Sequence, residues 1–128
     1  SFGDNVLVSL GDRINKGSFN LRTQCFFFDL AEQAERAGGR VVLQWGNQEV
    51  QTAKAWDNSK TRGPGGMLWE LWAYGIEPSQ FFAASSSYGK ALRHAPVVSQ
   101  LGEEILLVHG GLCPSERSLA EELRSMQQ

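Results

Sequence analysis

The sequence predicts an α/β domain, and three observations support that fold class. Short apolar runs rich in leucine and β-branched residues alternate with longer segments of helical character. The links between them are short, as in strand–helix–strand units with parallel strands. A polar, glycine-containing motif follows three of the apolar runs. Because open α/β sheets bind ligands at the carboxyl ends of their strands, these motifs are the candidate functional segments.

The first part of the chain is predicted to form one strand–helix–strand unit. Residues 5–10 indicate a buried strand that stops at Gly11. Ser18 is expected to cap a helix over residues 19–37, which should pack against both the sheet and a neighbouring element. Residues 40–45 indicate the second buried strand of the unit.

The middle of the chain is predicted to be mainly helical. Helices are expected over residues 49–56, 67–74 and 80–92, with a polar surface loop at 57–66. No composition shift inside this stretch indicates a domain boundary. Residues 1–128 are therefore expected to form one domain or a piece of one.

The last part is predicted to contain a hairpin and a helix. The runs 96–101 and 104–108 indicate two strands joined by a tight turn at Gly102-Glu103. Ser118 and Glu121 match a capping box, which indicates the start of a final helix.

Composition and charge exclude two classes of partner. The chain is 41% hydrophobic and 20% charged, as globular domains are. Its net charge of −2 gives no electrostatic footprint for nucleic acid. It has no run of about 18 apolar residues that could span a membrane. We therefore expect neither a nucleic-acid partner nor a membrane partner.

The cysteines and the N-terminal residues bear on cellular location. Cys25 and Cys113 are too few for a disulfide framework, which favours reduced thiols in a cytoplasmic-type environment, although the sequence also allows the two to pair. No signal peptide is visible. Because the chain begins with Ser1 and not Met, it is consistent with an excerpt of a longer protein.

Three types of ligand follow three predicted strands in a fixed order. Asp12 supplies a carboxylate, Asn47 an amide oxygen and His109 an imidazole. Such a mixed oxygen and nitrogen set suits Mn, Fe or Zn better than calcium, which prefers oxygen ligands. In two-metal hydrolases, ions about 3.5–4 Å apart polarise a phosphoryl group and generate a hydroxide nucleophile. We therefore expect a transition-metal site where these strands end.

The three motifs resemble those of the calcineurin-like metallophosphoesterase superfamily, whose hallmark segments are GDxxDRG, GNHE and HGG. The likeness covers about residues 5–114. The Ala37-Gly38-Gly39 approach to the second motif and the HGGLCP segment at 109–114 are most similar to phosphoprotein phosphatases, especially the Shewanella-like branch. The resemblance implies a calcineurin-like α/β sandwich, with mixed sheets flanked by helices, of which this chain is expected to hold an incomplete part.

The resemblance also implies roles for individual residues. Asp12 falls on the carboxylate that bridges two metals, and Asn47 and His109 fall on ligands of the second metal. Glu49 falls on the acid that closes GNHE and supports its loop. A divalent metal cofactor (Mn, Fe or Zn) is implied, with a phosphorylated protein or a small phosphoester as substrate.

Three residues depart from the family motifs. Asn15 replaces the aspartate that orients the catalytic histidine, Lys16 replaces the arginine that clamps phosphate, and Gln48 replaces the general-acid histidine. Glutamine cannot donate a proton in that sense, and losing such a group costs about 10²–10⁴ in rate. Lysine keeps the positive charge but lacks the two-pronged grip of a guanidinium. The changes at Asn15 and Gln48 go together chemically, because an aspartate at position 15 has nothing to orient once the histidine at position 48 is absent.

Two further family segments have no counterpart in the chain. No GDxH segment precedes Asp12, and no histidine follows His109. Of the ligands of the first metal, the chain would keep Asp12 alone, so we expect one weakly held ion or none. The predicted function is that of a metal-dependent phosphomonoester hydrolase lineage with impaired catalysis. The alternative is a non-catalytic phosphatase-like binding module or a truncated gene product.

A structural interpretation competes with each predicted role. Asp12 could be a turn carboxylate, Asn47 a turn residue and His109 a core histidine, but the motif context favours ligand positions for all three. For Lys16, phosphate contact and plain surface exposure are equally consistent with the sequence.

Other conspicuous residues are given structural interpretations. His94 is interpreted as a surface histidine and not as a second ligand. Trp69 and Trp72, on one stretch with Met67 and Leu68, are favoured as core over a substrate groove, because apolar stripes at helical spacing usually face the core. Cys113 lacks an evident base, so a catalytic thiolate is not expected.

Overall fold

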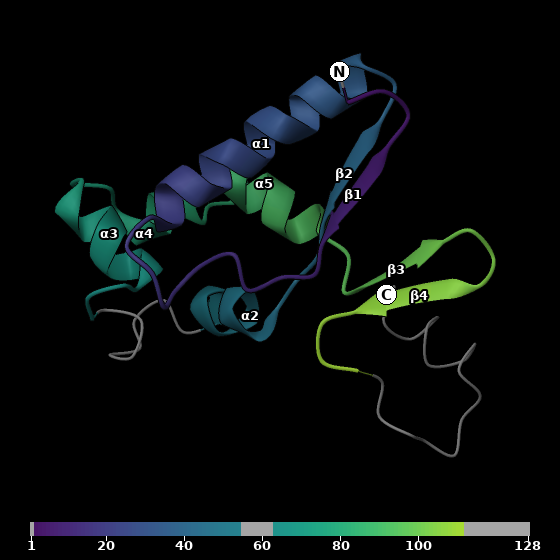
Figure 1. Ribbon diagram of the computed structural model, residues 1–128. Helices are drawn as coiled ribbons and strands as arrows, with labels where there is room; N and C mark the ends of the chain where they lie inside the picture. The colour runs from purple at the N-terminus through teal and green to yellow at the C-terminus, as the bar shows by residue number, and fades with distance from the viewer. Residues whose placement is uncertain (1, 55–62, 112–128) are drawn as a thin grey trace.

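The structure is a computed structural model and describes residues 2–54 and 63–111. In this part of the chain the elements follow the order β1–α1–β2–α2–α3–α4–α5–β3–β4 (Figure 1). The strands form two separate two-stranded sheets, β1–β2 and β3–β4. The predicted α/β class is therefore confirmed as a mixed fold with small sheets. The predictions for residues 55–62, for Cys113 and for a helix at Ser118 lie outside the described residues.

The predicted strand–helix–strand unit is confirmed. β1 (Val6–Ser9) and β2 (Arg40–Leu43) pair in parallel, with Val6 opposite Arg40 and Ser9 opposite Leu43. α1 (Asn20–Arg36) joins them and packs against both β2 and α3, as its apolar segment predicts. Both strands are two residues shorter than expected: β1 lacks one residue at each end, and β2 lacks the last two.

The predicted cap of α1 is wrong. The helix begins at Asn20, after Phe19, and Ser18 provides no side-chain cap. Instead, Glu70 of α3 (Met67–Ala73) accepts hydrogen bonds from the backbone N–H groups of Asn20 at 2.6 Å and Leu21 at 3.1 Å. A carboxylate at this end satisfies unpaired N–H groups and interacts favourably with the helix dipole. The cap therefore comes from another helix.

The single helix predicted over residues 80–92 is in fact two helices. α4 (Pro78–Phe81) ends, the chain turns, and α5 (Ser87–His94) starts in a new direction. The side chain of Ser86 caps α5 by accepting from the Gly89 N–H at 2.9 Å. Gly89 packs so closely on the carbonyl of Ala83 that a Cβ would collide with it. A strong N-cap and this close approach together outweigh the helical propensity of the connecting residues.

The hairpin prediction is confirmed. β3 (Val98–Leu101) and β4 (Ile105–Val108) pair antiparallel, with Leu101 opposite Ile105. Gly102 adopts a φ of +62° at the turn, a conformation that glycine takes without steric cost. α2 (Asn47–Lys54) starts two residues before the prediction, so the second polar motif is itself the first turn of that helix.

The strands are less buried than the sequence predicts. Val6 and Leu7 of β1 are 48% and 40% exposed, and Ile105 of β4 is 54% exposed. In the described part of the chain each sheet has only two strands, so every strand is an edge strand. The apolar runs are strands, but they are not the buried central strands that were expected.

The core lies between the helices and the loop after β1. Its buried residues come from that loop, α3 and α5: Ile14, Met67, Leu68, Leu71, Tyr88 and Leu92. Figure 1 shows these helices gathered on one side of the molecule, with the hairpin on the other. None of the described helices has the length and apolar character needed to cross a lipid bilayer.

Trp69 and Trp72 are not core residues, contrary to the favoured interpretation. They are 41% and 76% exposed, while Met67 and Leu68 are buried as expected. α3 turns Met67, Leu68 and Leu71 inward, which leaves both indoles on its outer side. There they line a surface pocket of about 650 Å³.

Candidate metal centre

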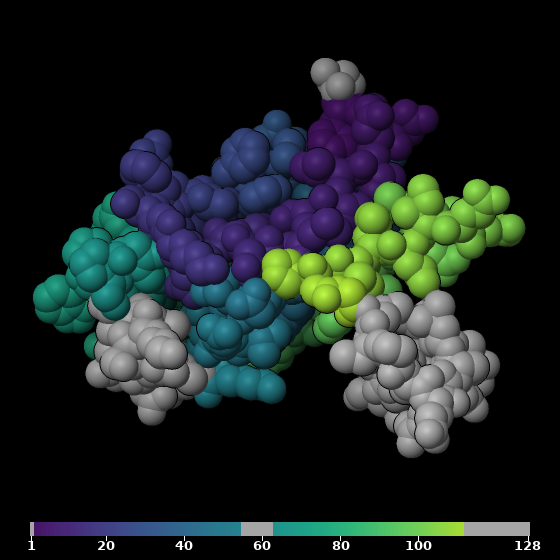
Figure 2. Space-filling view, turned by 60° about the horizontal axis from the view of Figure 1, so that its bottom comes forward, coloured from purple at the N-terminus to yellow at the C-terminus, as the bar shows by residue number. Residues whose placement is uncertain are grey.

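Five of the six predicted site residues meet where β1, β2 and β4 end. Asp12 and Asn15 lie in the loop after β1, Asn47 and Gln48 begin α2, and His109 follows β4. Figure 2 shows the yellow-green residues after β4 against the purple loop and the blue-teal α2.

The hairpin reaches the site through contacts with the end of β2. The side chain of Gln44 donates from Nε2 to the Leu107 carbonyl at 2.8 Å. The next residue, Trp45, donates its backbone N–H to the Pro96 carbonyl at 3.0 Å. These two bonds place the end of β4 beside the other two strand ends, although β4 belongs to a different sheet. One side-chain bond and one backbone bond, and not a common sheet, therefore bring the three motifs together.

Glu49 holds the loop after β1 against the start of α2. Its fully buried carboxylate accepts from the backbone N–H groups of Asp12 and Arg13, both at 2.8 Å, and of Gly46 at 2.9 Å. This is the loop-supporting role that the resemblance implies for Glu49. Because the same carboxylate binds both motifs, it fixes Asp12 relative to the start of α2.

Arg13 is the cationic partner of this buried carboxylate. Its guanidinium lies 3.6 Å from Glu49 Oε1 and donates to the Gln44 carbonyl at 2.6 Å. Burial lowers the pKa of Arg13, and the charge of Glu49 partly opposes that effect. The guanidinium is almost wholly buried, so it serves the scaffold and is not available to a ligand.

The loop after β1 has an unusual backbone. Asp12, Asn15 and Lys16 have φ values of +55°, +65° and +57°, although none of them is glycine. Such conformations are maintained when surrounding contacts enforce them, and they cluster at functional sites. Gly46 contributes to the tight fit, because a Cβ there would collide with the Asp12 carboxylate.

Asp12, Asn47 and His109 bring three ligand-type atoms to one point. His109 Nε2 lies 3.1 Å from Asn47 Oδ1 and 3.4 Å from Asp12 Oδ1. The Asp12 carboxylate also accepts from the Gln48 backbone N–H at 2.9 Å, which fixes its direction. The side chains of Asp12 and His109 are 28% and 30% exposed, so the cluster is open to solvent on one side.

His109 is oriented by its other ring nitrogen. Nδ1 lies 2.8 Å from the Leu10 carbonyl, which can only accept a hydrogen bond. In the neutral imidazole the proton is therefore on Nδ1, and Nε2 carries a lone pair directed at Asp12 and Asn47. Metal-binding histidines use this same arrangement of a backbone carbonyl on the remote nitrogen.

Asn15 and Gln48 are in direct contact. Asn15 donates from Nδ2 to Gln48 Oε1 at 3.1 Å and to Thr52 Oγ1 at 3.0 Å. Its Oδ1 accepts the backbone N–H of Met67 at 2.9 Å. Two of the residues that depart from the family motifs, Asn15 and Gln48, are thus hydrogen-bonded to each other.

The Asn47 amide can take two orientations, which differ in what they present to Asp12 and His109. With Oδ1 facing them, three acceptor atoms converge. With the amide reversed, Nδ2 donates to Asp12 Oδ2 and to His109 Nε2, both at 3.1 Å. The reversed amide also accepts from Gln48 Nε2 at 2.9 Å. A cation suits the first orientation, and a cation-free cluster suits the second.

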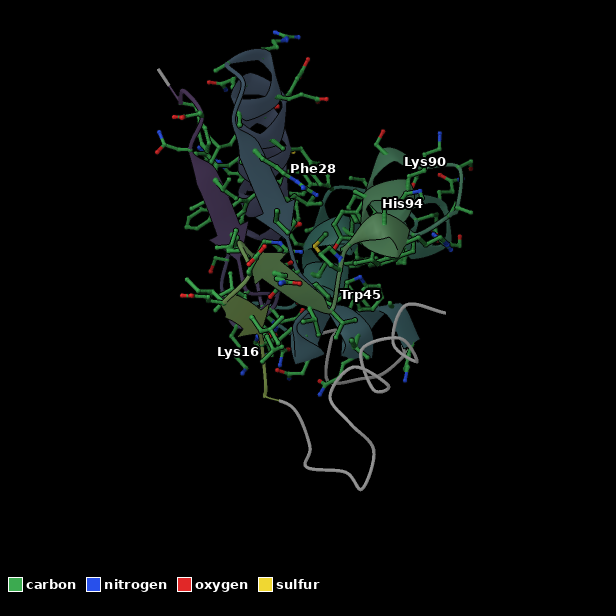
Figure 3. The ribbon with its side chains drawn as sticks, turned by 90° about the vertical axis from the view of Figure 1, so that its right-hand side faces the viewer. Lys16, Phe28, Trp45, Lys90 and His94 are labelled. Carbon is green, nitrogen blue, oxygen red and sulfur yellow. The ribbon has the colours of Figure 1, made fainter. Side chains whose placement is uncertain are left out.

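Lys16 is the predicted site residue that is not drawn into the cluster. It is exposed in the loop after β1 and makes no side-chain hydrogen bond or ion pair among the described residues. Figure 3 shows it well apart from His94 and Lys90, which both lie on α5. His94 is exposed at the end of α5, as its surface interpretation requires.

With Asn47 Oδ1 toward Asp12 and His109, the spacing of the three donor atoms would suit one divalent cation. Ligand atoms bound about 2.0–2.2 Å from Zn²⁺ lie roughly 3.0–3.6 Å from one another, and the atoms here are 3.1–3.4 Å apart. Within the described residues, no group of three or more His, Cys, Asp or Glu side chains is placed so that it could hold a metal ion. The present cluster has two such side chains, and its third ligand is an amide. With Asp12 as the single carboxylate ligand, the affinity for a divalent cation should be low.

Comparison with known proteins gives a short sequence match. A stretch of 52 residues is 42% identical to the uncharacterized protein C1840.07c of Schizosaccharomyces pombe (strain 972 / ATCC 24843). It covers 41% of this chain and 16% of the length of that protein. No protein-family model matches the chain, and no solved structure matches it. The function is therefore proposed from the geometry of the site.

Sequence reasoning missed three groups that organise the site. Thr52 lies one helical turn after Gln48, a spacing that places both side chains on one face of α2, and this face meets Asn15. The Leu10 carbonyl and the Met67 N–H are backbone groups. Every residue except proline has them, so no residue type in the sequence could have singled them out.

Proposed function

We propose that Asp12, Asn47 and His109 bind a single divalent cation and that the chain derives from calcineurin-like metallophosphoesterases, retaining weak activity on phosphomonoesters. The observation that supports this most is the convergence of a carboxylate, an amide group and an imidazole lone pair within 3.4 Å of one another, with the Asn47 oxygen toward the other two in the cation-binding orientation. In this proposal the two small sheets are part of the sandwich fold of that superfamily, with Mn, Fe or Zn as the cation.

Each residue would have a separate task in binding a phosphoester. Asp12 and His109 would hold the cation together with Asn47, and the side on which both are exposed leaves room for a ligand. Glu49 keeps the Asp12 loop in place and touches no substrate. A bound divalent cation supplies charge stabilisation to a phosphoryl group and lowers the pKa of water. Lys16 is the cationic side chain nearest in sequence to Asp12 that remains exposed, and in this proposal it contacts phosphate.

Catalysis should be slow for a specific chemical reason. Gln48 is an amide whose oxygen is bonded to Asn15, so it offers no titratable proton to a leaving group. No other described side chain bonded to the Asp12–Asn47–His109 cluster is an available acid. General acid catalysis contributes about 10²–10⁴ in rate, and the proposed activity lacks that factor.

The test combines a binding readout with a kinetic one. Free Mn²⁺ is measured by electron paramagnetic resonance during titration, and hydrolysis of p-nitrophenyl phosphate is followed with Mn²⁺ present. Asp12→Asn removes the carboxylate charge while keeping an acceptor for the Gln48 N–H. Asp29→Asn makes the same change on the exposed face of α1 and is the matched control.

A histidine pair completes the design. His109→Ala should abolish Mn²⁺ binding, whereas His94→Ala on α5 should leave it unchanged. The proposal is supported if binding and hydrolysis are both lost in Asp12→Asn and His109→Ala and are kept in the two controls. Mn²⁺ binding that survives both substitutions would show that the cation lies elsewhere.

A second candidate function is a non-catalytic phosphate-binding module. The Asn15–Gln48 pair favours it, because both family positions are filled by amides that have no titratable proton to give to a leaving group. The probe is a phosphoserine peptide titrated by calorimetry, with Lys16→Gln as the test variant and Lys90→Gln as the control. Saturable binding that depends on Lys16, without release of phosphate, would favour this function over the hydrolase.

A further inference from the structure

We propose that Gln48 decides whether the Asp12–Asn47–His109 cluster accepts a cation, because a chain of hydrogen bonds through Gln48 fixes the orientation of the Asn47 amide. This inference rests on the proposed metal centre and adds a positioning residue to it. Gln48 acts through Asn47 and touches no cation itself. The chain of bonds begins at a backbone group in α3.

The first link fixes Asn15. The backbone N–H of Met67 can only donate, and it lies 2.9 Å from Asn15 Oδ1. Reversing the Asn15 amide would set an NH₂ group against this N–H. Asn15 therefore keeps its oxygen toward α3 and its Nδ2 toward Gln48 and Thr52.

The second link fixes Gln48. Its Oε1 accepts from Asn15 Nδ2 at 3.1 Å, so its own NH₂ group points the other way. That NH₂ group lies 2.9 Å from the nearer atom of the Asn47 amide. Only an oxygen at that place can accept the hydrogen bond.

The third link decides what the cluster offers to a cation. With its oxygen toward Gln48, Asn47 turns Nδ2 toward Asp12 Oδ2 and His109 Nε2, each 3.1 Å away. The amide N–H groups then occupy the space between the carboxylate and the imidazole. They repel a cation and bond to the two ligands that a cation needs.

Cation binding and this chain of bonds therefore exclude each other. To present Oδ1 to a cation, Asn47 must set its NH₂ group against the NH₂ group of Gln48. Both groups are donors, so that contact is repulsive unless Gln48 leaves Asn15. The chain of bonds thus keeps the cluster in its cation-free form, and changing residue 48 should release it.

Three substitutions interrupt the chain in different ways. Gln48→Met has a similar length and no donor, so Asn47 is free to reverse. Gln48→Glu accepts from both Asn15 and Asn47, which forces Asn47 to reverse. Asn15→Asp accepts from Met67 with one oxygen and from Gln48 with the other, so the direction of every later bond is inverted.

The measurement is Mn²⁺ affinity by electron paramagnetic resonance, on the full 128-residue chain. All three variants should bind Mn²⁺ at least tenfold more tightly than the unaltered chain. Because two of them add a negative charge, Ser18→Asp serves as a control that adds the same charge to the loop that contains Asn15. It should leave the affinity within about twofold. Thermal unfolding by circular dichroism checks that each variant is folded.

A second readout needs no metal. In the metal-free unaltered chain, nuclear magnetic resonance should show nuclear Overhauser contacts from the Asn47 NH₂ protons to the His109 ring protons on the two carbons bonded to Nε2. In Gln48→Glu and Asn15→Asp these contacts should disappear, because the NH₂ group then faces residue 48. A merely structural role for Gln48 would neither raise metal affinity nor move this contact.

The outcomes separate this inference from the metal centre itself. Tighter binding in all three variants, with no change in Ser18→Asp, supports the role of Gln48. Equal affinity in the unaltered chain and every variant overturns that role and leaves the metal centre standing. A gain in the two charged variants without one in Gln48→Met also overturns it, since charge alone then explains the effect. If neither the unaltered chain nor any variant binds Mn²⁺, both proposals fail.

Discussion

The carboxylate of Glu49 lies 2.8 Å from the backbone nitrogen of Asp12, and this contact joins the loop after β1 to the first turn of α2. The two residues belong to motifs that are 37 positions apart in sequence. The carboxylate is fully buried, and its charge balances that of Arg13. Because the same carboxylate accepts from the Asp12 backbone N–H, it also holds Asp12 in position.

Removing the charge of Glu49 should therefore destabilise the whole fold. In Glu49→Gln an NH₂ group faces backbone donors, and Arg13 keeps a buried charge without a partner. Breaking one side of a buried ion pair costs about 3–5 kcal/mol. We expect a loss of this size in the free energy of unfolding, measured by urea denaturation. Glu32→Gln, in an exposed pair with Arg36, should cost less than about 1 kcal/mol. Similar losses for the two variants would contradict the role of Glu49.

A methyl group at residue 46 should disturb the site sterically. In Gly46→Ala the new Cβ meets the carboxylate and the backbone nitrogen of Asp12. The loop must shift, which we expect to weaken Mn²⁺ binding at least tenfold and to lower the melting temperature. Gly110→Ala is the matched control, because a Cβ there meets nothing within 4 Å although it adjoins His109. An unchanged Mn²⁺ affinity in Gly46→Ala would show that the loop adapts.

The hydroxyl of Tyr88 should make the fold sensitive to alkaline pH. It is buried and has no hydrogen-bond partner among the described residues, and burial, with a smaller effect from Glu49, raises the pKa of Tyr88 far above 10. The unfolded chain then loses this proton from about pH 10 upward while the folded chain keeps it, so the free energy of unfolding falls as pH rises through that range.

Tyr88→Phe tests this dependence. The variant should lose part of the alkaline destabilisation and be equally or slightly more stable at neutral pH, because an unsatisfied buried hydroxyl is removed. Urea denaturation at pH values between about 7 and 11 measures both effects. Tyr74→Phe is the control, since Tyr74 is 67% exposed. An identical pH profile for the unaltered chain and Tyr88→Phe would refute the assignment.

Glu70 should matter for α1 and not only for its own helix. Its carboxylate accepts from the N–H groups of Asn20 and Leu21 at the start of α1. In Glu70→Gln one of these donors loses its acceptor, at a cost of about 1–3 kcal/mol. Hydrogen exchange should speed up in the first turn of α1, although the substitution lies in α3. Glu77→Gln, an exposed acid outside α1 and α3, should leave that exchange unchanged.

Local patterns were enough to predict much of the fold. The apolar runs, the glycines that end them and the short links predict a parallel pair joined by a helix, and β1–α1–β2 has that form. The hairpin β3–β4 follows from the same kind of signal. Exposure could not be predicted this way, since an apolar run indicates a strand whether or not another layer covers it, and Val6 and Ile105 are exposed.

The errors along the chain arise where a distant or unusual contact overrides the local pattern. Ser18 is a good capping residue, yet Glu70 caps α1, because a buried carboxylate satisfies more donors than a hydroxyl can. The stretch 80–92 has helical propensity, but the Ser86 cap and the approach of Gly89 to Ala83 split it. Trp69 and Trp72 share an apolar helix with core residues and still face outward.

For the candidate site, the sequence by itself determined which residue types follow each strand: a carboxylate at Asp12, an amide at Asn47 and an imidazole at His109. The tertiary structure brought their atoms within 3.4 Å of one another and bonded Asn15 to Gln48. In our proposal, contacts that start from the Met67 backbone N–H also set which end of the Asn47 amide meets Gln48. The physical reason is that a residue's identity fixes its donors and acceptors, whereas their direction depends on neighbours that only folding brings into contact.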